Sequence, residues 1–292
     1  MSTLMPTATL ACGPHTLKMG RRTLTMGIVN ITPDSFSDGG YFYSHEKAIA
    51  HGLQLVDEGA DILDIGGEST RPFSEPVGES EEQDRVLPVI ENLAKRIPVP
   101  ISIDTTKASV AREAVAAGAT IINDISALRM DPHMASTAAQ CRVPLILMHM
   151  KGSPKDMQVN PVYDDLLPDI MNFLSDAMDH AVSAGVDPAN IVLDPGIGFG
   201  KTVAHNLQIL NQIDRLQSLG KPILIGPSRK MFIRQLVKRT DEKDTDPLSA
   251  KVAWGTQAAV AAAAMRGAQV VRVHDVARTR ATLAVIDAIR FA

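Results

Sequence analysis

The sequence contains only two cysteines among its 292 residues, Cys12 and Cys141, and they lie far apart along the chain. A disulfide framework needs several cysteines at short spacings, and a structural zinc site needs closely spaced Cys or His ligands, so neither is expected. The first residues also show no secretory signal pattern. We therefore expect the protein to work in a reducing compartment, the cytoplasm.

The chain also lacks a strong excess of charge and any long hydrophobic run. Its formal net charge is -4, without blocks of like charge, so there is no basic patch to bind nucleic acid or an anionic membrane surface. The longest stretch of small apolar residues, 257–265, is closed by Arg266. A membrane helix needs roughly 20 apolar residues, so we expect no membrane span. The expected ligands are small molecules, held by local clusters of side chains.

Eight short apolar runs, rich in β-branched residues, alternate with segments whose apolar residues recur at helical spacing. The runs predict buried parallel strands, and the expected strands span residues 24–30, 62–66, 101–104, 120–124, 145–149, 191–194, 223–226 and 270–274. The expected helices span residues 45–58, 79–96, 109–117, 166–183, 207–219, 232–238, 250–265 and 277–289. This alternation predicts the α/β class and a single-domain (β/α)8 TIM barrel over residues 24–292.

Residues 1–23 do not share the pattern. Gly13-Pro14 and Gly20 break them into short stretches, which predicts an N-terminal extension formed by a β-hairpin beneath the barrel. No residue of this extension suggests chemistry. We expect it to have a structural role.

Each predicted strand stops at or near a polar or charged residue. These residues are Asn30, Glu68, Asp104, Asn123, His149, Asp194, Lys230 and His274. In (β/α)8 barrels the active site is built where the strands end. The rim that carries these side chains is therefore the predicted active site.

The rim residues indicate which ligand would fit. Asp104, Asn123 and Asp194 would place two carboxylates and an amide in one mouth, a set that suits a planar heterocycle with several N–H donors. The glycine-rich turn after Asp194 would let such a flat ligand approach the backbone beneath Phe199. Arg272 and His274 are two residues apart on one strand, so both would face the mouth and could clamp an anion.

Five strings, in order along the chain, carry a resemblance to a known family. They are Asn-x-Thr-Pro-Asp-Ser-Phe-Ser-Asp-Gly-Gly at 30–40, Asp-x-Gly-Gly-Glu-Ser-Thr-Arg-Pro at 64–72, Asp-Pro-Gly-x-Gly-Phe-Gly-Lys at 194–201, Ser-Arg-Lys at 228–230 and Arg-Val-His-Asp-Val at 272–276. Over residues 26–276 the chain resembles the dihydropteroate synthase family. The specificity comes from the five strings together, since any one alone would be weak evidence.

The resemblance implies a reaction in folate synthesis. A (β/α)8 barrel of this family joins the diphosphate ester of 6-hydroxymethyl-7,8-dihydropterin to p-aminobenzoate, and it releases pyrophosphate and 7,8-dihydropteroate. Loss of pyrophosphate would leave a resonance-stabilised pterin cation, which the aryl amine attacks in an SN1-type step. The resemblance also implies Mg2+ as cofactor and a homodimer.

The resemblance also implies roles for particular residues. The expected pterin ligands are Asp104, Asn123, Asp194, Lys230 and Phe199. The expected diphosphate ligands are Asn30, Arg272 and His274, with Asn30 also on the metal. The expected aminobenzoate pocket consists of Thr70, Arg71, Pro72 and Ser228. Phe36 and Asp38 of the first loop, together with Lys230, are the expected catalytic residues beside the cation.

The chain departs from the family at one position. After Ser-Arg-Lys the family usually has a small hydroxyl residue, which would help to hold the aminobenzoate carboxylate, whereas this chain has Met231. The N-terminal amides of the following helix would still favour an anion. We expect aminobenzoate binding to persist but to be weaker or altered in preference, including toward sulfonamide mimics.

Three alternatives share parts of the pattern. A pterin-dependent methyltransferase barrel would share the fold and the carboxylates, but it should lack the first-loop string and the Arg272 and His274 pair. A Schiff-base aldolase could use Lys230, but it needs a lysine of lowered pKa, for which Arg229 and the nearby carboxylates give no clear reason. A non-catalytic pterin-binding module would keep the pocket without the leaving-group residues, and these are present.

Overall fold

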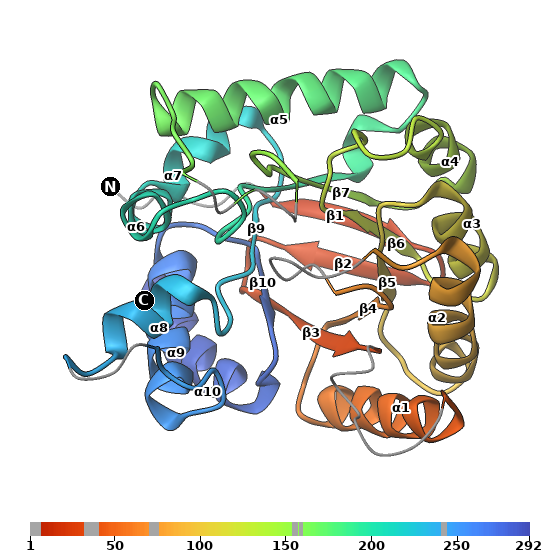
Figure 1. Cartoon of the computed structure of the whole chain (residues 1–292), viewed down its shortest axis with the longest axis horizontal. Coiled ribbons are helices and arrows are strands. Elements are labelled where there is room, and N and C mark those ends of the chain that lie inside the picture. Colours follow the sequence, from red (N-terminus) through yellow and green to blue (C-terminus); the bar gives the residue numbers. More distant parts are fainter. Residues whose placement is uncertain (1–6, 32–40, 70–75, 154–156, 158–159, 241–243) are drawn as a thin grey trace.

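A parallel eight-stranded sheet forms the centre of the computed structural model, which describes residues 7–31, 41–69, 76–153, 157, 160–240 and 244–292 (Figure 1). The strands are β3 (Leu24–Asn30), β4 (Ile62–Gly66), β5 (Ile101–Asp104), β6 (Ile121–Asp124), β7 (Leu145–Met148), β8 (Ile191–Asp194), β9 (Leu224–Ile225) and β10 (Val270–Val273). They pair in the order β8-β7-β6-β5-β4-β3-β10-β9. A parallel bridge between Leu193 and Ile223 joins β8 to the segment that leads into β9, so the sheet closes into a barrel.

Helices cover the outside of the sheet, as the alternation of the sequence predicts. They are α1 (Tyr41–Asp57), α2 (Glu79–Ala94), α3 (Ala108–Ala116), α4 (Met134–Cys141), α5 (Leu166–Ser183), α6 (Val203–Asn211), α7 (Ile213–Leu216), α8 (Met231–Val237), α9 (Ala250–Met265) and α10 (Val276–Arg290), with the 3-10 turns η2 (Pro188–Asn190) and η3 (Gln217–Leu219). The (β/α)8 TIM barrel is therefore confirmed. In the part of the chain that is described, no helix has the length and apolar character needed to span a membrane.

Two helical predictions were wrong in detail. The helix expected over 207–219 is divided into α6, α7 and η3, because Gln212 leaves helical geometry with a φ of -128°. Helix α4 was not expected at all. It is eight residues long and rich in alanine, so it carries too few large apolar residues to display a helical period.

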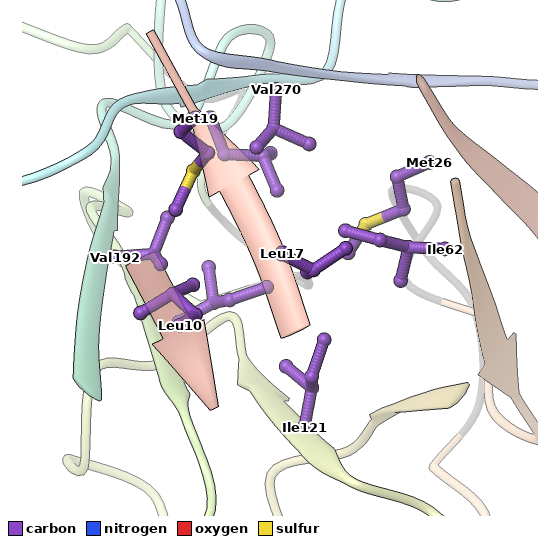
Figure 2. Close-up of a pocket in the computed structure, with 10 residues that line it drawn as sticks. Leu10, Leu17, Met19, Met26, Ile62, Ile121, Val192 and Val270 are labelled. Atoms are coloured by element: carbon purple, nitrogen blue, oxygen red, sulfur yellow. The ribbon is translucent and has the colours of Figure 1, made fainter. Parts of the chain in front are cut away.

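The N-terminal extension is a β-hairpin, as expected. Strands β1 (Ala8–Cys12) and β2 (His15–Met19) pair antiparallel, and Gly13 turns between them at a φ of +59°. Figure 2 shows Leu10, Leu17 and Met19 of the hairpin around a small apolar cavity that barrel residues also line. The hairpin thus covers one end of the barrel interior and buries its apolar side chains there.

Along four of the strands, β4, β6, β8 and β10, the barrel interior changes from apolar to polar within two residues. Ile62, Ile121, Val192 and Val270 pack together with the hairpin in one apolar cluster. Side chains two positions apart on a strand point to the same face, so the next interior position in each strand forms a second layer. Those positions hold Asp64, Asn123, Asp194 and Arg272. The interior is therefore apolar at the hairpin end and charged toward the carboxyl ends of the strands.

Candidate active site

Strand register brings three predicted rim residues, Asn30, Asp104 and Asn123, to one level with Gly66 of β4. Asn30 pairs with Gly66, Gly66 pairs with Asp104, and Asp104 pairs with Asn123. Gly66 has no side chain, and a Cβ at this position would be in ordinary van der Waals contact with the Cβ of Asp104, at 3.4 Å. The side chains at 30, 104 and 123 therefore share one mouth without a bulky residue between them.

Arg272 lies at the centre of the polar layer. Its Nε donates a hydrogen bond to Asp64 Oδ2 at 2.5 Å, and a terminal nitrogen of its guanidinium donates to Asp104 Oδ2 at 2.7 Å. Asn123 Nδ2 donates to the same Asp64 oxygen at 3.2 Å. Burial alone would lower the pKa of Arg272, but the two carboxylates hold this pKa above its ordinary value. Arg272 is therefore a permanent cation inside the barrel.

The environment of Asp104 also changes its titration. Burial raises its pKa to about 7; Arg272 acts in the opposite direction, and the negative charge of Asp64 adds to the rise. A carboxyl group with such a pKa changes its charge near neutral pH. It can accept hydrogen bonds from a ligand as the carboxylate or donate one as the acid.

Asp194 and Lys230 form the opposite side of the mouth. Asp194 Oδ1 accepts a hydrogen bond from Gly196 N at 2.7 Å, and burial raises the pKa of this carboxyl to about 6. Lys230 Nζ lies 3.9 Å from the centroid of the Phe199 ring. A Cβ at Gly198 would come within 2.9 Å of Lys230 Cδ, so the glycine lets the lysine lie across the turn.

The lowered basicity of Lys230 was not expected from the sequence. Burial lowers its pKa to about 8, and the cation of Arg272 lowers it further, while Asp194 and Asp104 act in the opposite direction. The expectation that nothing would depress this pKa was therefore wrong, because the tertiary structure removes the amine from water. The residue remains mainly protonated at neutral pH.

Ser228 and His274 meet at the end of β10. Ser228 Oγ lies 2.9 Å from His274 Nδ1 and accepts a hydrogen bond from His274 N at 3.3 Å. Arg229 follows in left-handed geometry with a φ of +58°, and its backbone N–H donates to Thr256 Oγ1. This turn places Lys230 at the N-cap of α8. A predicted aminobenzoate contact and a predicted diphosphate contact are thus hydrogen-bonded to each other.

Several predicted site residues lie outside the described part of the chain. These are Phe36, Asp38, Thr70, Arg71 and Pro72. The structure brings together the others, which are Asn30, Asp104, Asn123, Asp194, Phe199, Ser228, Lys230, Arg272 and His274. Among the described residues, no group of three or more His, Cys, Asp or Glu side chains is placed to hold a metal ion. The ligand roles of all these residues stay predictions.

Comparison with known proteins identifies the family of the chain. The family model described as pterin binding enzyme matches residues 26–274. The chain is 46% identical over 286 residues to the dihydropteroate synthase of Bacillus subtilis, which covers 98% of this chain and 95% of the relative. The chain belongs to the pterin binding enzyme family.

Two solved structures of dihydropteroate synthase from Xanthomonas albilineans extend the match. One, with 4-aminobenzoic acid, has a TM-score of 0.90, 47% identity and coverage of 98% of this chain and 99% of the other. The second, with 7,8-dihydropteroate, has a TM-score of 0.86, 44% identity and coverage of 97% and 99%. The match to pterin binding enzymes therefore includes nearly the whole barrel and its hairpin.

Sequence reasoning missed one buried carboxylate of this pterin binding enzyme. Asp64 is fully buried in β4 and contacts both Arg272 and Asn123. A signal for it exists in the sequence, because it is an ionisable residue inside an otherwise apolar strand, two positions after Ile62. It was given no role because it precedes the end of its strand.

Lys201 is the second residue that the sequence reasoning passed over. Its Nζ donates to Phe199 O at 2.9 Å and lies 2.9 Å from His149 Nδ1. Burial lowers the pKa of Lys201 to about 7, and burial together with Lys201 lowers the pKa of His149 to about 2. His149 is therefore neutral and accepts from the amine. This contact fixes the turn that carries Phe199 in the pterin binding enzyme.

Proposed function

We propose that this chain condenses 6-hydroxymethyl-7,8-dihydropterin diphosphate with p-aminobenzoate to 7,8-dihydropteroate, the dihydropteroate synthase reaction of folate synthesis. The observation that carries the proposal is the polar layer inside the barrel. It combines two carboxylates of raised pKa, Asp104 and Asp194, with the Asn123 amide and the cations Arg272 and Lys230. Relatives with the same fold are dihydropteroate synthases, one of them solved with 7,8-dihydropteroate.

The pterin ring fits the hydrogen-bonding groups of this layer. Its amino-pyrimidine edge offers several N–H donors, which Asp194 as a carboxylate and Asn123 through its amide oxygen can accept. Lys230 supplies a donor for the ring carbonyl or a ring nitrogen, and the Phe199 ring beneath it offers an apolar face. In a buried site such bonds replace those that the ring makes with water, so binding is specific for the heterocycle.

The reaction then follows from the placement of charge. The C–O bond between the pterin methylene and the diphosphate breaks, and its electron pair leaves with the pyrophosphate. The p-aminobenzoate nitrogen attacks the methylene carbon, and the resulting ammonium loses a proton to water. Arg272 and His274 would bind the departing anion, while Asp104 and Asp194 would stabilise the positive charge on the pterin. Such fixed charges lower the barrier without a covalent nucleophile.

We propose Mg2+ as cofactor, held by the Asn30 side-chain oxygen and by substrate diphosphate oxygens. Asn30 ends β3 at the mouth and is half-buried, and a side-chain amide oxygen suits a magnesium ion that keeps waters and binds through phosphates. Bound there, Mg2+ would neutralise charge on the leaving pyrophosphate. Removal of Mg2+ with EDTA should reduce diphosphate binding, and Asn30→Ala should weaken the effect of added Mg2+ on binding.

The test of the proposed function is a direct assay. Purified protein is mixed with the dihydropterin diphosphate, p-aminobenzoate and Mg2+, and pyrophosphate and 7,8-dihydropteroate are followed together. We expect equimolar release, which His274→Ala and Asp194→Asn should reduce strongly. Pterin binding without pyrophosphate release would contradict the proposal and support a non-catalytic pterin-binding module. Methyl transfer from a methylated folate in place of condensation would support the methyltransferase alternative.

We also propose that the protein forms a homodimer through helices α8, α9 and α10. Helix α9 packs against both α8 and α10, and large apolar side chains are exposed on all three, including Leu236, Trp254 and Ile289. Large apolar side chains exposed on helices that pack together suit an association surface. Sedimentation equilibrium should give twice the chain mass, and Trp254→Glu should give the monomer. A monomeric unmodified protein would contradict the dimer.

The compartment proposed is the cytoplasm. Both cysteines are free thiols, with Cys12 buried in β1 and Cys141 at the end of α4. Free thiols persist where the surroundings are reducing. Cell fractionation with detection of the native protein would test this location.

A further inference from the structure

Asp64, on β4, contacts two site residues from strands that lie on either side of β4 in the sheet. One oxygen, Oδ2, accepts from Arg272 Nε at 2.5 Å and from Asn123 Nδ2 at 3.2 Å. Arg272 is on β10 and Asn123 is on β6, and neither strand is a direct neighbour of β4. A single carboxylate oxygen therefore fixes two side chains across the barrel interior.

The stability of the fold does not account for this carboxylate. The Asp64 side chain is completely buried, and its second oxygen, Oδ1, has no hydrogen-bond partner among the described residues. Burying a carboxylate costs free energy, and replacing a buried ion pair by apolar residues is often neutral or stabilising. The strands on either side could be held by apolar packing, as they are in the layer nearest the hairpin.

We propose that Asp64 is a positioning residue, which holds the Arg272 guanidinium and the Asn123 amide in the orientations that contact the bound pterin diphosphate. This role rests on the proposed function, since it requires Arg272 and Asn123 to meet that substrate. Asp64 acts through these two residues, because its own side chain is covered from the mouth of the barrel. Pre-orientation of ligand groups lowers the entropy that binding must overcome.

The charge of Asp64 has a second effect, which supplies an independent measurement. It raises the pKa of Asp104, after the larger effect of burial. The other groups that act on Asp104 are Arg272 and Lys230, which lower this pKa, and Glu82 on α2, which raises it. Removing the charge at position 64 should therefore move the ionisation of Asp104 to lower pH.

The first experiment compares Asp64→Asn with the unmodified protein. We expect kcat/KM for the dihydropterin diphosphate to fall about 10- to 100-fold, the effect of losing a hydrogen bond to a charged group. The KM for p-aminobenzoate should change by less than about threefold, because that substrate does not use Arg272 or Asn123. Retention of kcat/KM within about threefold would overturn the proposal.

Asp124→Asn is the matched control. Asp124 is also fully buried and belongs to the same strand as Asn123, but among the described residues its carboxylate accepts hydrogen bonds from Ser126 and Leu128 in the following turn. We expect a lower melting temperature with kcat/KM for the pterin within about threefold of the parent. If both variants lost stability and activity in the same proportion, Asp64 would be merely structural and the proposal would be overturned.

The pH profile separates positioning from general destabilisation. In the parent, kcat/KM for the pterin should increase with pH through a midpoint near 7 as Asp104 ionises. In Asp64→Asn this midpoint should lie at lower pH, whereas in Asp124→Asn it should not move. An unchanged midpoint of the pH profile in Asp64→Asn would contradict the proposed effect of the Asp64 charge on the pKa of Asp104.

A double variant keeps the test decisive if Asp64→Asn does not fold. Asp64→Asn with Arg272→Gln removes both members of the Asp64–Arg272 ion pair, and it leaves Asp104 without Arg272 just as Arg272→Gln alone does. Added to Arg272→Gln, Asp64→Asn should weaken equilibrium binding of 6-hydroxymethylpterin by no more than Asn123→Ala does, because Asp64 then acts on the pterin through Asn123. A loss more than about tenfold beyond that of Asn123→Ala would overturn action through Arg272 and Asn123. This binding measurement needs no turnover. A parent protein without synthase activity would therefore refute the proposed function but not the positioning role of Asp64.

Discussion

The amine of Lys230 lies 3.9 Å from the centre of the Phe199 ring, at the mouth of the barrel. The two residues come from different turns, one after β8 and one after β9. A cation over an aromatic face is stabilised by the ring, by up to about 2 kcal/mol when both are removed from water. Phe199 therefore holds in place the lysine that we expect to bind the pterin.

Phe199→Leu should weaken this arrangement. We expect pterin binding to weaken about 5- to 10-fold, because Lys230 loses the ring that orients it. Phe291→Leu is a suitable control, since Arg290 lies 5.3 Å from the centre of that ring in a similar contact outside the proposed site. Isothermal titration with 6-hydroxymethylpterin measures both. Equal effects of the two substitutions would argue against a specific role for Phe199.

Pterin binding should weaken in acid because of Asp194. Burial raises the pKa of this carboxyl to about 6 from an ordinary value of 3.8. The carboxylate that accepts the pterin N–H groups is therefore lost as pH falls through about 6, and affinity should decrease with it. The effect on the stability of the fold has the opposite sign. The folded state binds this proton more tightly than the unfolded state does, so the destabilisation caused by the buried carboxylate decreases as pH falls from 6 toward 4. Affinity that stays constant down to pH 5 would contradict this assignment.

Gly196 should tolerate no side chain. It adopts a φ of +70°, and a Cβ there would lie 1.9 Å from the carbonyl oxygen of His149. Gly196→Ala should therefore distort the turn, lower the melting temperature and abolish pterin binding. Gly220 has nearly the same φ, +68°, with nothing within 4 Å of such a Cβ. Gly220→Ala should cost only the roughly 1 kcal/mol of left-handed strain and leave binding unchanged.

Met231→Ser tests the departure from the family. Met231 begins α8, next to the Ser228 and Lys230 turn, and its side chain is 45% exposed. A hydroxyl at this position should lower the KM for p-aminobenzoate about 3- to 10-fold by adding one hydrogen bond to the carboxylate. Leu236→Ser changes an exposed apolar residue of the same helix and should leave this KM unchanged. The same KM in Met231→Ser and the parent would reject the expectation.

The hairpin should contribute to stability without affecting the reaction. Leu10 is 3% exposed and packs against the closed end of the barrel (Figure 2). Leu10→Ala should lower the free energy of unfolding by about 2–4 kcal/mol, as loss of a buried leucine does elsewhere. Chemical denaturation measures this, and the pterin KM should not change. Leu207→Ala, at an exposed position of α6, should have little effect on stability.

The strands were the most predictable part of the fold. β3, β4, β5 and β8 have the predicted limits, because a strand buried on both faces must be a continuous apolar run. The short α4 could not be foreseen, since its helical state depends on packing against neighbours more than on its own pattern. The division of the helix over 207–219 depends on a local backbone change at Gln212 that no period reveals.

The sequence by itself determined which residues reach the mouth of the barrel, because strand ends and the alternation of side chains follow from short-range geometry. It therefore indicated Asp104, Asp194 and the Arg272 and His274 pair. Only the tertiary structure decided which of these groups pair and how strongly each is removed from water. The bond from Arg272 to Asp64 spans 208 positions of sequence, and the lowered pKa of Lys230 comes from burial among side chains of several strands. Such distances and desolvation exist only once the barrel has closed.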